Sequence, residues 1–276
     1  MQDKVIIVTG AASGFGRLVC EMCLARGASV AALDVDGEGL ASLAKEMANE
    51  SADARLITRS CDVTDLAQVE AAASAVVAKF GRIDVMINNA GTMPLAFFAD
   101  HKAAASAWSR CIDINIKGVM NGIAAVYDQM IEQGRGHVIN LSSIYGNFPV
   151  AGAGVYGATK SAVNFLSESL RVEAQGKIKV TTVKPTGVPA TNLGGGIVND
   201  QAIVGILGQN TESYLAKLQS LSSGQFPPEQ MDPNDPQYMA LDPSYIAQAI
   251  VDAITQPWGV TTSEITVRAT GDEYVL

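Results

Sequence analysis

The feature that most limits how this chain folds is a regular alternation of short apolar segments with longer amphipathic ones. The apolar segments lie at residues 4–8, 29–33, 54–60, 83–87, 137–141 and 180–184, and most are rich in β-branched residues. Continuous runs of this kind are typical of strands buried on both faces of a parallel sheet. The alternation predicts a Rossmann-like α/β fold, a doubly wound parallel sheet with helices on both faces.

Helical patterns fill most of the sequence between these strands, at residues 17–26, 40–49, 66–80, 101–133 and 156–174. The long pattern at 101–133 is interrupted near Asn115, which lies between Ile114 and Ile116. A polar side chain on a buried helix face must find a partner, so we expect Asn115 to bend the helix.

Length and composition favour one large domain over residues 1–276, with 48% hydrophobic residues available for its core. The net charge of −9 argues against binding to nucleic acid or to anionic membranes. No segment approaches the roughly 20 apolar residues that span a bilayer, and the first residues show no signal-peptide pattern. We therefore expect a cytoplasmic protein without nucleic-acid or membrane partners.

The cysteines are Cys20, Cys23, Cys61 and Cys111. Cys20 and Cys23 have the C-x-x-C spacing of redox pairs and of half metal sites, but both fall inside a helical pattern. The histidines, at positions 101 and 137, complete no ligand set with matching spacing. We interpret the cysteines as small buried residues and predict neither a metal nor a disulfide.

A glycine-rich turn, Thr-Gly-Ala-Ala-Ser-Gly-Phe-Gly at residues 9–16, follows the first strand and precedes a helix. Glycine permits a tight turn and a close approach of backbone to a diphosphate. The N-terminus of a helix presents free N–H groups and a partial positive charge. We therefore expect the turn to bind a dinucleotide through Gly10, Ser13, Gly14, Phe15 and Gly16.

A carboxylate, Asp34, ends the second strand. A carboxylate there can accept hydrogen bonds from the adenosine ribose of NAD and would repel the 2′-phosphate of NADP, and Asp36 adds to the repulsion. An ordinary turn residue at a strand end is the alternative interpretation. The context favours NAD over NADP as the cofactor.

Small or polar residues also follow the other strands. Because the carboxyl ends of parallel strands meet at one edge of a sheet, we expect these residues to line the same cofactor site. They are Asp62, Val63, Asn89, Ala90, Gly91, Pro185, Val188 and Thr191. Asp62 is also able simply to begin a loop, and asparagines at a strand end can hold neighbouring strands together.

Residues 140–160 carry the pattern most directly linked to chemistry. Tyr156 and Lys160 are at positions i and i+4 of a helical pattern, so their side chains lie on one face. A phenol has a pKa of about 10, and an adjacent ammonium lowers it toward the pH at which acid–base catalysis is effective. Ser143, at a strand end, can place a second hydroxyl beside the phenol. These groups fit alcohol–carbonyl chemistry, although any helix can carry Tyr and Lys at this spacing.

Taken together, these stretches resemble the short-chain dehydrogenase/reductase family over roughly residues 4–191, with a final strand at 263–268. The matches appear in the family's order: T-G-x-x-x-G-x-G at 9–16, N-N-A-G at 88–91, Asn115, Ser143 and Y-x-x-x-K at 156–160. One departure lies at 185–191, where Thr186 replaces a glycine and Thr191 lies one position beyond the family's threonine.

The resemblance implies a role for each catalytic position. Tyr156 would be the general acid/base, Lys160 would lower its pKa and bind the nicotinamide ribose, and Ser143 would orient the substrate oxygen. Asn115 would hold a water that extends the proton relay from Lys160. The resemblance also implies a homo-oligomer, a tetramer or a dimer.

Residues 192–242 lie outside the resemblance. They begin with three glycines, continue with a mixed helical pattern at 201–221 and end in a turn-rich run with several prolines. The segment is too apolar for disorder, so we expect a lid that packs over the site. A structural insertion that contacts a neighbouring subunit is the alternative.

The expected substrate pocket consists of Met93, Tyr145, Phe148, Val150, Thr186 and Gly187. It offers no cluster of positive charge for a carboxylate or phosphate. The sequence therefore predicts an NAD-dependent oxidoreductase that interconverts a hydrophobic secondary alcohol, cyclic and steroid-like ones included, and its ketone. The alternatives are a non-catalytic dinucleotide-binding sensor or scaffold, and a sugar-type enzyme of the same family that acts on a polar substrate.

Overall fold

The computed structural model describes residues 1–48, 54–188, 191–223 and 225–275. Within them lies a seven-stranded sheet of order β3-β2-β1-β4-β5-β6-β7, and each neighbouring pair is parallel. The strands are β1 (Val5–Thr9), β2 (Ser29–Asp34), β3 (Leu56–Ser60), β4 (Val85–Asn88), β5 (Gly136–Leu141), β6 (Ile178–Val183) and β7 (Glu264–Ile265). The predicted doubly wound parallel sheet is confirmed.

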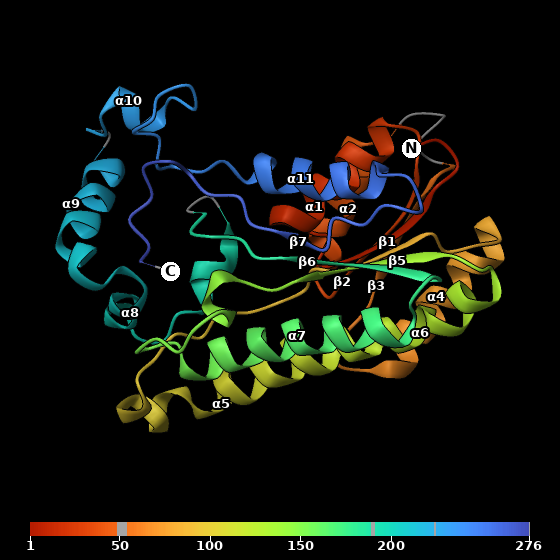
Figure 1. Ribbon diagram of the computed structural model, residues 1–276, viewed down its shortest axis with the longest axis horizontal. Helices are drawn as coiled ribbons and strands as arrows, with labels where there is room; N and C mark the ends of the chain where they lie inside the picture. The colour runs from red at the N-terminus through yellow and green to blue at the C-terminus, as the bar shows by residue number, and fades with distance from the viewer. Residues whose placement is uncertain (49–53, 189–190, 224, 276) are drawn as a thin grey trace.

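Two layers of helices enclose the sheet (Figure 1). One face is covered by α1 (Gly14–Ala25), α2 (Gly37–Glu46) and α11 (Pro243–Thr255), and the other by α4 (Leu66–Phe80), α5 (His101–Ile112), α6 (Gly118–Glu132) and α7 (Gly154–Glu173). Within β1, Ile6 and Val8 belong to the apolar cluster of the first layer, and Val5 and Ile7 to that of the second. Burial on both faces explains the unbroken apolar run, since each such side chain contributes about 1.5–3 kcal/mol.

The order of the strands reverses between β1 and β4, which are neighbours in the sheet. Val8 of β1 lies beside Ile87 of β4, and Thr9 lies beside Leu33 of β2. The glycine-rich turn, the carboxylate after β2 and the segment after β4 therefore meet at one point. Ligands of open α/β sheets bind in the crevice at such a reversal.

Helix boundaries follow local capping. The α2 helix begins before the predicted residue 40 because the Asp36 carboxylate accepts hydrogen bonds from the backbone N–H groups of Glu38 and Gly39. The far end of that predicted helix, Asn49, lies outside the described residues. The predicted interruption at Asn115 is confirmed as a π-helical turn, Asp113–Lys117, between α5 and α6.

One helix, α11, has no counterpart in the sequence-based prediction, which placed Asp242 and Pro243 in a turn-rich loop. The Asp242 carboxylate instead accepts a hydrogen bond from Ser244 N at 2.8 Å, and Pro243 occupies the first turn. Both residues favour the start of a helix as well as a turn. Ile246, Ile250 and Ile254 of α11 are buried in the first core layer.

The last strand is shorter than the predicted 263–268. Lys184 N donates to Ile265 O at 2.8 Å, and at the next position of the ladder Thr186 reaches Val267 O through its hydroxyl, at 3.4 Å, instead of its backbone N–H. The pairing of β6 with β7 therefore ends at Ile265.

The insertion after β6 contains a series of short helices, confirming its mixed helical pattern. They are η4 (Asn192–Gly196), η5 (Asp200–Ile203), α8 (Val204–Leu207), η6 (Gly208–Asn210), α9 (Thr211–Ser222) and α10 (Pro228–Met231). In Figure 1, α8, α9 and α10 stand beyond the carboxyl ends of the strands. Ala202, Ile206 and Leu207 are buried in an apolar cluster that also contains Tyr145 and Tyr156. No helix in the described part of the chain combines the length and the apolar character needed to cross a membrane.

Candidate active site

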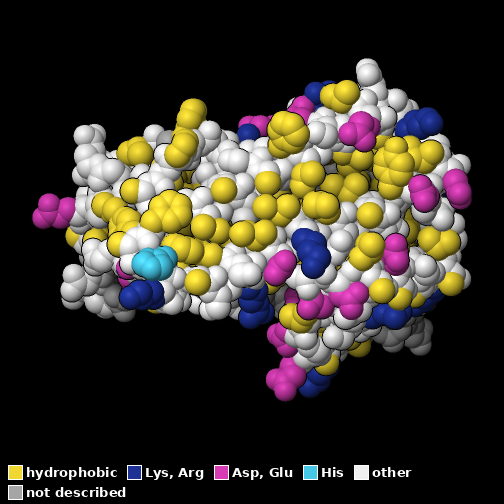
Figure 2. Space-filling view, turned by 90° about the horizontal axis from the view of Figure 1, so that it is seen from below, with side chains coloured by type: hydrophobic (Ala, Val, Ile, Leu, Met, Phe, Trp, Pro, Cys, Tyr) yellow, Lys and Arg dark blue, Asp and Glu magenta, His cyan; other side chains and the backbone are white. Residues whose placement is uncertain are grey.

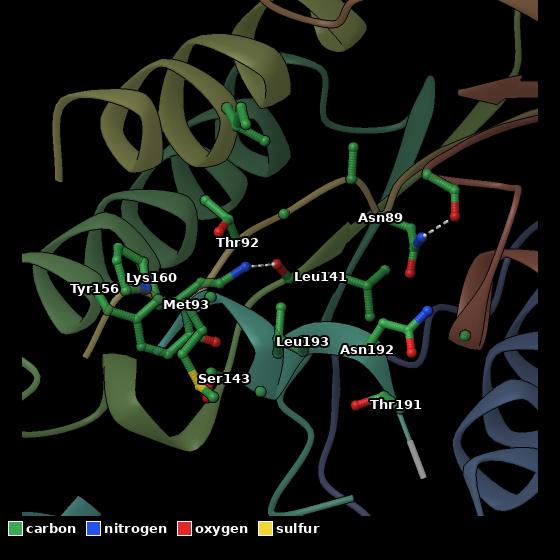
Figure 3. Close-up of a pocket in the computed structure, with 18 of the residues that line it drawn as sticks. Asn89, Thr92, Met93, Leu141, Ser143, Tyr156, Lys160, Thr191, Asn192 and Leu193 are labelled. Carbon is green, nitrogen blue, oxygen red and sulfur yellow. Dashed lines mark hydrogen bonds between the residues drawn. The ribbon is translucent and has the colours of Figure 1, made fainter. Parts of the chain in front are cut away.

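A cavity of about 1340 Å³ lies at the carboxyl ends of the strands. Most of the predicted site residues line it. They are Gly10, Ser13, Gly14, Phe15, Asp34, Asp62, Val63, Asn89, Ala90, Gly91, Met93, Ser143, Tyr145, Tyr156, Lys160, Pro185, Thr186, Gly187, Val188 and Thr191. Thr191, Asn192 and Leu193, at the start of the insertion, border the same space as the catalytic candidates (Figure 3).

The glycine-rich turn is packed so tightly that two of its positions exclude any other residue. A Cβ on Gly16 would lie 2.2 Å from the Gly10 carbonyl oxygen, so Gly16 supports the turn from behind and does not line the cavity. Gly10 has φ +65°, and a Cβ there would lie 2.8 Å from Asn89 Nδ2. At the start of α1, Ser13 makes no side-chain cap and the first turn holds no acidic residue. This uncapped helix N-terminus beside the cavity fits a diphosphate.

The segment after β4 holds the turn in place. Asn89 Nδ2 donates to the carbonyl oxygens of Thr9 at 2.9 Å and Gly10 at 3.0 Å. The backbone N–H groups of Asn89 and Ala90 both donate to Thr9 Oγ1. Asn88 has the structural role considered above, since its Nδ2 joins β4 to β5 by donating to Asn140 Oδ1 at 2.8 Å.

Asp34 connects the end of β2 to the glycine-rich turn. Its Oδ2 accepts from Ala12 N at 2.9 Å and its Oδ1 from Asp36 N at 3.0 Å. Each carboxylate oxygen can accept a further hydrogen bond. Asp62 is similarly bonded to its own turn, where its Oδ1 accepts from Thr64 N and Thr64 Oγ1 at 2.9 and 2.8 Å.

Tyr156 lies buried in the first turn of α7, with its ring centroid 5.5 Å from that of Tyr145 in an edge-on contact. Burial raises the pKa of the Tyr156 phenol, a hydrogen bond with the Ser143 side chain lowers it in part, and Cys111 raises it. Ser143 and Tyr156 are thus brought together as the sequence predicted. The phenol therefore stays protonated at neutral pH.

Two glycines allow the approach of Ser143 to Tyr156. The turn η3 (Ile144–Gly146) packs directly on α7. A Cβ on Gly157 would lie 2.9 Å from the Tyr145 carbonyl oxygen, and one on Gly146 would lie 2.8 Å from the backbone carbon of Lys160. The close packing of backbone on backbone fixes the distance between the two hydroxyls.

Lys160 is buried one turn further along α7, and its ammonium points toward β5 (Figure 3). Its Nζ donates to the Leu141 carbonyl at 2.8 Å and lies 5.7 Å from the Tyr156 ring centroid. Burial lowers the pKa of Lys160 to about 8, partly opposed by Cys111. The ammonium therefore bonds a backbone carbonyl rather than the phenol.

Asn115 lies behind the cavity, fully buried in the π-helical turn. Its Oδ1 accepts from Thr92 N at 2.9 Å, and its Nδ2 donates to Thr92 O at 2.9 Å and Thr159 Oγ1 at 3.1 Å. The side chain thus positions the segment after β4 against α7. The water relay implied by the resemblance stays a prediction.

Two predicted pocket residues need correction. Phe148 is 63% exposed and Val150 packs against the third apolar cluster, and neither lines the cavity. The Phe148 side chain, in the loop that follows η3, is therefore largely in contact with solvent. Among the lining residues that lay outside the predicted pocket are Tyr214 of α9 and Tyr274 near the C-terminus. No local pattern marks Tyr274, since tertiary packing alone brings it to the site.

The cysteines are all buried with free thiols. Across the described ranges, no three His, Cys, Asp or Glu side chains are grouped closely enough to hold a metal ion. Cys20 and Cys23 lie in α1.

A family model described as short chain dehydrogenase matches residues 4–202. The chain therefore belongs to the short-chain dehydrogenase/reductase family and is an oxidoreductase of that family.

Curated relatives agree with this assignment. An uncharacterized oxidoreductase of Staphylococcus aureus is 31% identical, covering 97% of this chain and 98% of that protein. The glycine betaine reductase of Emericella nidulans is also 31% identical over 97% of this chain, but this chain spans only 19% of that protein's length.

Solved structures show the same fold. The closed form of a serine dehydrogenase complexed with NADP+ has a TM-score of 0.76 and 28% identity, covering 98% of this chain and 97% of that chain. A family member from Burkholderia phymatum in complex with NAD has a TM-score of 0.74 and 27% identity, covering 96% and 89%. Relatives of this fold thus bind either nucleotide.

Proposed function

We propose that this protein is an NAD-dependent dehydrogenase that interconverts a hydrophobic secondary alcohol and its ketone. The observation that carries the proposal is the buried pair of hydroxyls, Ser143 and Tyr156, at the wall of a cavity shared with an uncapped helix N-terminus. One hydroxyl can polarise a substrate oxygen while the other moves its proton.

The residues suit proton transfer in either direction. The protonated Tyr156 phenol is ready to donate a proton to a carbonyl oxygen held by Ser143. For alcohol oxidation the phenol must lose that proton, which a neighbouring positive charge favours. Lys160, with a pKa lowered to about 8 by burial, is still mainly an ammonium at neutral pH. It would supply that charge and bind the nicotinamide ribose.

The residues present fit a dinucleotide. Gly10, Ser13, Gly14 and Phe15 would hold its diphosphate, Asp62 and Val63 its adenine, and Val188 and Thr191 its nicotinamide end. When bound, the nicotinamide ring supplies the hydride acceptor or donor.

Asp34 supports NAD over NADP. Its carboxylate lies beside the glycine-rich turn, and Val35 and Asp36 follow it without a basic residue. The guanidinium of Arg17 on α1 is paired with Glu21 and Glu46 at 3.0 and 2.7 Å. A 2′-phosphate would therefore meet a carboxylate without a free cation from α1 to offset it.

The cavity lining supports an uncharged substrate. Among the described residues that line it, Arg110 and Lys160 are the cations, and the insertion contributes Leu193, Ile197 and Ile203. The segment at 192–242 would act as a lid, since it packs on the cluster that contains Tyr145 and Tyr156. We propose that the fold and this lid together form the single domain predicted for residues 1–276.

An apolar face supports a homo-oligomer, a dimer or a tetramer. Phe165 and Val172 of α7 are 76% and 62% exposed, and Ile112 of α5 is 47% exposed. Figure 2 shows hydrophobic side chains across the face that these helices form. A second copy of the chain would cover them, and sedimentation measurements would give the number of copies. The cytoplasmic location stays a prediction.

The proposal is tested by following reduction of NAD and NADP, in parallel, with cyclic, steroidal and sugar-type alcohols. We expect NADH formation with hydrophobic cyclic alcohols and at least a tenfold lower rate with NADP. Turnover only with sugar alcohols would favour the polar-substrate enzyme instead. NADH binding without turnover of any alcohol would favour the sensor.

A further inference from the structure

The C-terminal segment returns to the site and is bonded to the insertion (Figure 1). Val275 N donates to Ile206 O at 3.0 Å, and Asn210 Nδ2 donates to Glu273 O at 2.9 Å. Lys217 of α9 forms an ion pair with Glu273 at 2.6 Å. The insertion and the C-terminal segment are therefore one packed unit at the wall of the cavity.

Each half of this unit contributes a tyrosine to the cavity, Tyr214 from α9 and Tyr274 from the C-terminal segment. Their hydroxyl oxygens are 2.9 Å apart and their ring centroids 5.8 Å apart. The Tyr274 hydroxyl lies directly against Gly187, where an added Cβ would come within 1.5 Å of it. The pair therefore joins the insertion to the loop that follows β6.

A pair of phenols holds two protons but needs only one for its mutual hydrogen bond. Within the described residues, neither hydroxyl has another hydrogen-bond partner. Burial raises the pKa of both phenols, so both stay protonated at neutral pH. One O–H donor of the pair is therefore left without an acceptor among the residues that the structure describes.

We propose that the Tyr214–Tyr274 pair is a substrate subsite, which donates a hydrogen bond to a second, uncharged oxygen of the substrate. This inference rests on the proposed function and narrows its substrate class to secondary alcohols or ketones that carry another hydroxyl or carbonyl group.

The charges around the pair favour an uncharged oxygen. Lys217 is paired with Glu273, and Arg268 is paired with Asp272 at 2.6 Å. A substrate carboxylate bound here would lose water without gaining a free cation, which is costly. A neutral oxygen needs only the spare phenol proton.

The Tyr145 ring is a neighbour of both the reacting oxygen and the subsite. Tyr145 lies edge-on to Tyr156 with a centroid separation of 5.5 Å. It also belongs to the same apolar cluster as Tyr214 and Tyr274 and interacts electrostatically with both. The carbon skeleton of a substrate would pack on the Tyr145 ring, with one oxygen at Tyr156 and the other at the pair.

The test compares cyclohexanol with the cyclohexane-1,2-, 1,3- and 1,4-diols as ligands in saturating NADH, with which alcohols cannot react. Affinity is read from the quenching of NADH fluorescence. Since one net hydrogen bond is at stake, we expect at least one diol to bind about three- to tenfold more tightly than cyclohexanol. In the Tyr214→Phe/Tyr274→Phe double variant this advantage should fall to about onefold, while cyclohexanol affinity changes less than about twofold.

Single variants sharpen the result. Tyr214→Phe and Tyr274→Phe should each keep part of the advantage, because the remaining tyrosine retains its hydroxyl and its proton. Tyr245→Phe makes the same change on the outer surface of α11 and should leave all affinities unchanged. The proposal is overturned if no diol binds more tightly than cyclohexanol, or if the advantage survives in the Tyr214→Phe/Tyr274→Phe double variant. The readout is independent of turnover, so failure of the proposed reaction would appear separately in the alcohol assay.

Discussion

The two edges of the sheet both bury ionisable groups but treat them differently. At the amino ends of the strands, Asp84 accepts a hydrogen bond from Val5 N at 2.9 Å and forms an ion pair with Arg82. His137 Nε2 is 2.8 Å from Thr181 Oγ1. Thr181 donates its proton to Thr262 O at 2.6 Å, so the histidine must be the donor in their contact.

At the carboxyl ends of the strands, buried side chains keep hydrogen-bond donors that have no acceptor among the described residues. Among the described residues, the Lys160 ammonium has one acceptor, the Leu141 carbonyl, although it carries three donors. The Tyr156 phenol interacts with the Ser143 side chain, and the Tyr214–Tyr274 pair has a spare proton within the same described residues. Groups at the amino edge are satisfied by fixed partners and stabilise the fold. At the carboxyl edge, a ligand can use the spare donors, and the buried Lys160 ammonium reduces the stability of the fold.

The largest expected difference between an effect on turnover and an effect on folding stability is in Lys160→Met. Turnover should fall by at least about a hundredfold, because proton transfer loses its charged neighbour. Folding stability at pH 7 should nevertheless rise. The shift of the Lys160 pKa from 10.5 to about 8 amounts to about 3 kcal/mol. The lost bond to Leu141 offsets about 1 kcal/mol, which leaves a gain of about 2 kcal/mol.

The pH dependence of that gain has a defined sign. Since the folded pKa lies below the unfolded one, wild-type stability rises as pH increases from about 8 to about 10.5. The advantage of Lys160→Met should shrink over this window in urea unfolding. A variant less stable than wild type at pH 7 would show that Lys160 is satisfied like the groups of the other edge.

A smaller effect is expected at the amino edge, in His137→Gln. Burial, with Lys179 and Lys4, lowers the pKa of His137 to about 3. The unfolded chain takes up this proton below a pH of about 6.5, so wild-type stability is lost as the pH falls from there. The loss of folding stability that is due to His137 amounts to about 2 kcal/mol at pH 5.

Glutamine can still donate to Thr181 but does not titrate. His137→Gln should therefore lose about 2 kcal/mol less stability than wild type between pH 7 and pH 5, with turnover at pH 7 unchanged. Thermal or urea unfolding of both proteins at pH 7 and pH 5 measures this difference in the loss of stability. An equal loss in both proteins would mean that other groups control acid stability.

Features fixed by local pattern were predictable from the sequence. Buried β-branched runs marked the strands, and Asn115 marked the π-helical turn. The spacing of Tyr156 and Lys160 placed both on one buried face of α7. Features set by long-range packing were not predictable from the sequence. Asp242 and Pro243 suit a turn as well as a helix start, and only the core contact of α11 decides between them.

The site shows the same division. Phe148 looked like a pocket wall because it follows Ser143 closely, but its side chain is exposed. Tyr274 reaches the cavity through tertiary contacts, with its hydroxyl bonded to that of Tyr214 and packed against Gly187. The partner of Lys160 was also unpredictable, because burial and the position of the Leu141 carbonyl direct the ammonium to β5.

The most direct test of the account is Tyr156→Phe, measured for both turnover and NADH affinity. Removal of the hydroxyl takes away the proton that the reaction moves but leaves the turn at residues 9–16 intact. We predict that turnover of the best alcohol falls by at least about a thousandfold, with NADH affinity within about threefold of wild type. Near-normal turnover in this variant would contradict the assignment of Tyr156 as the general acid/base.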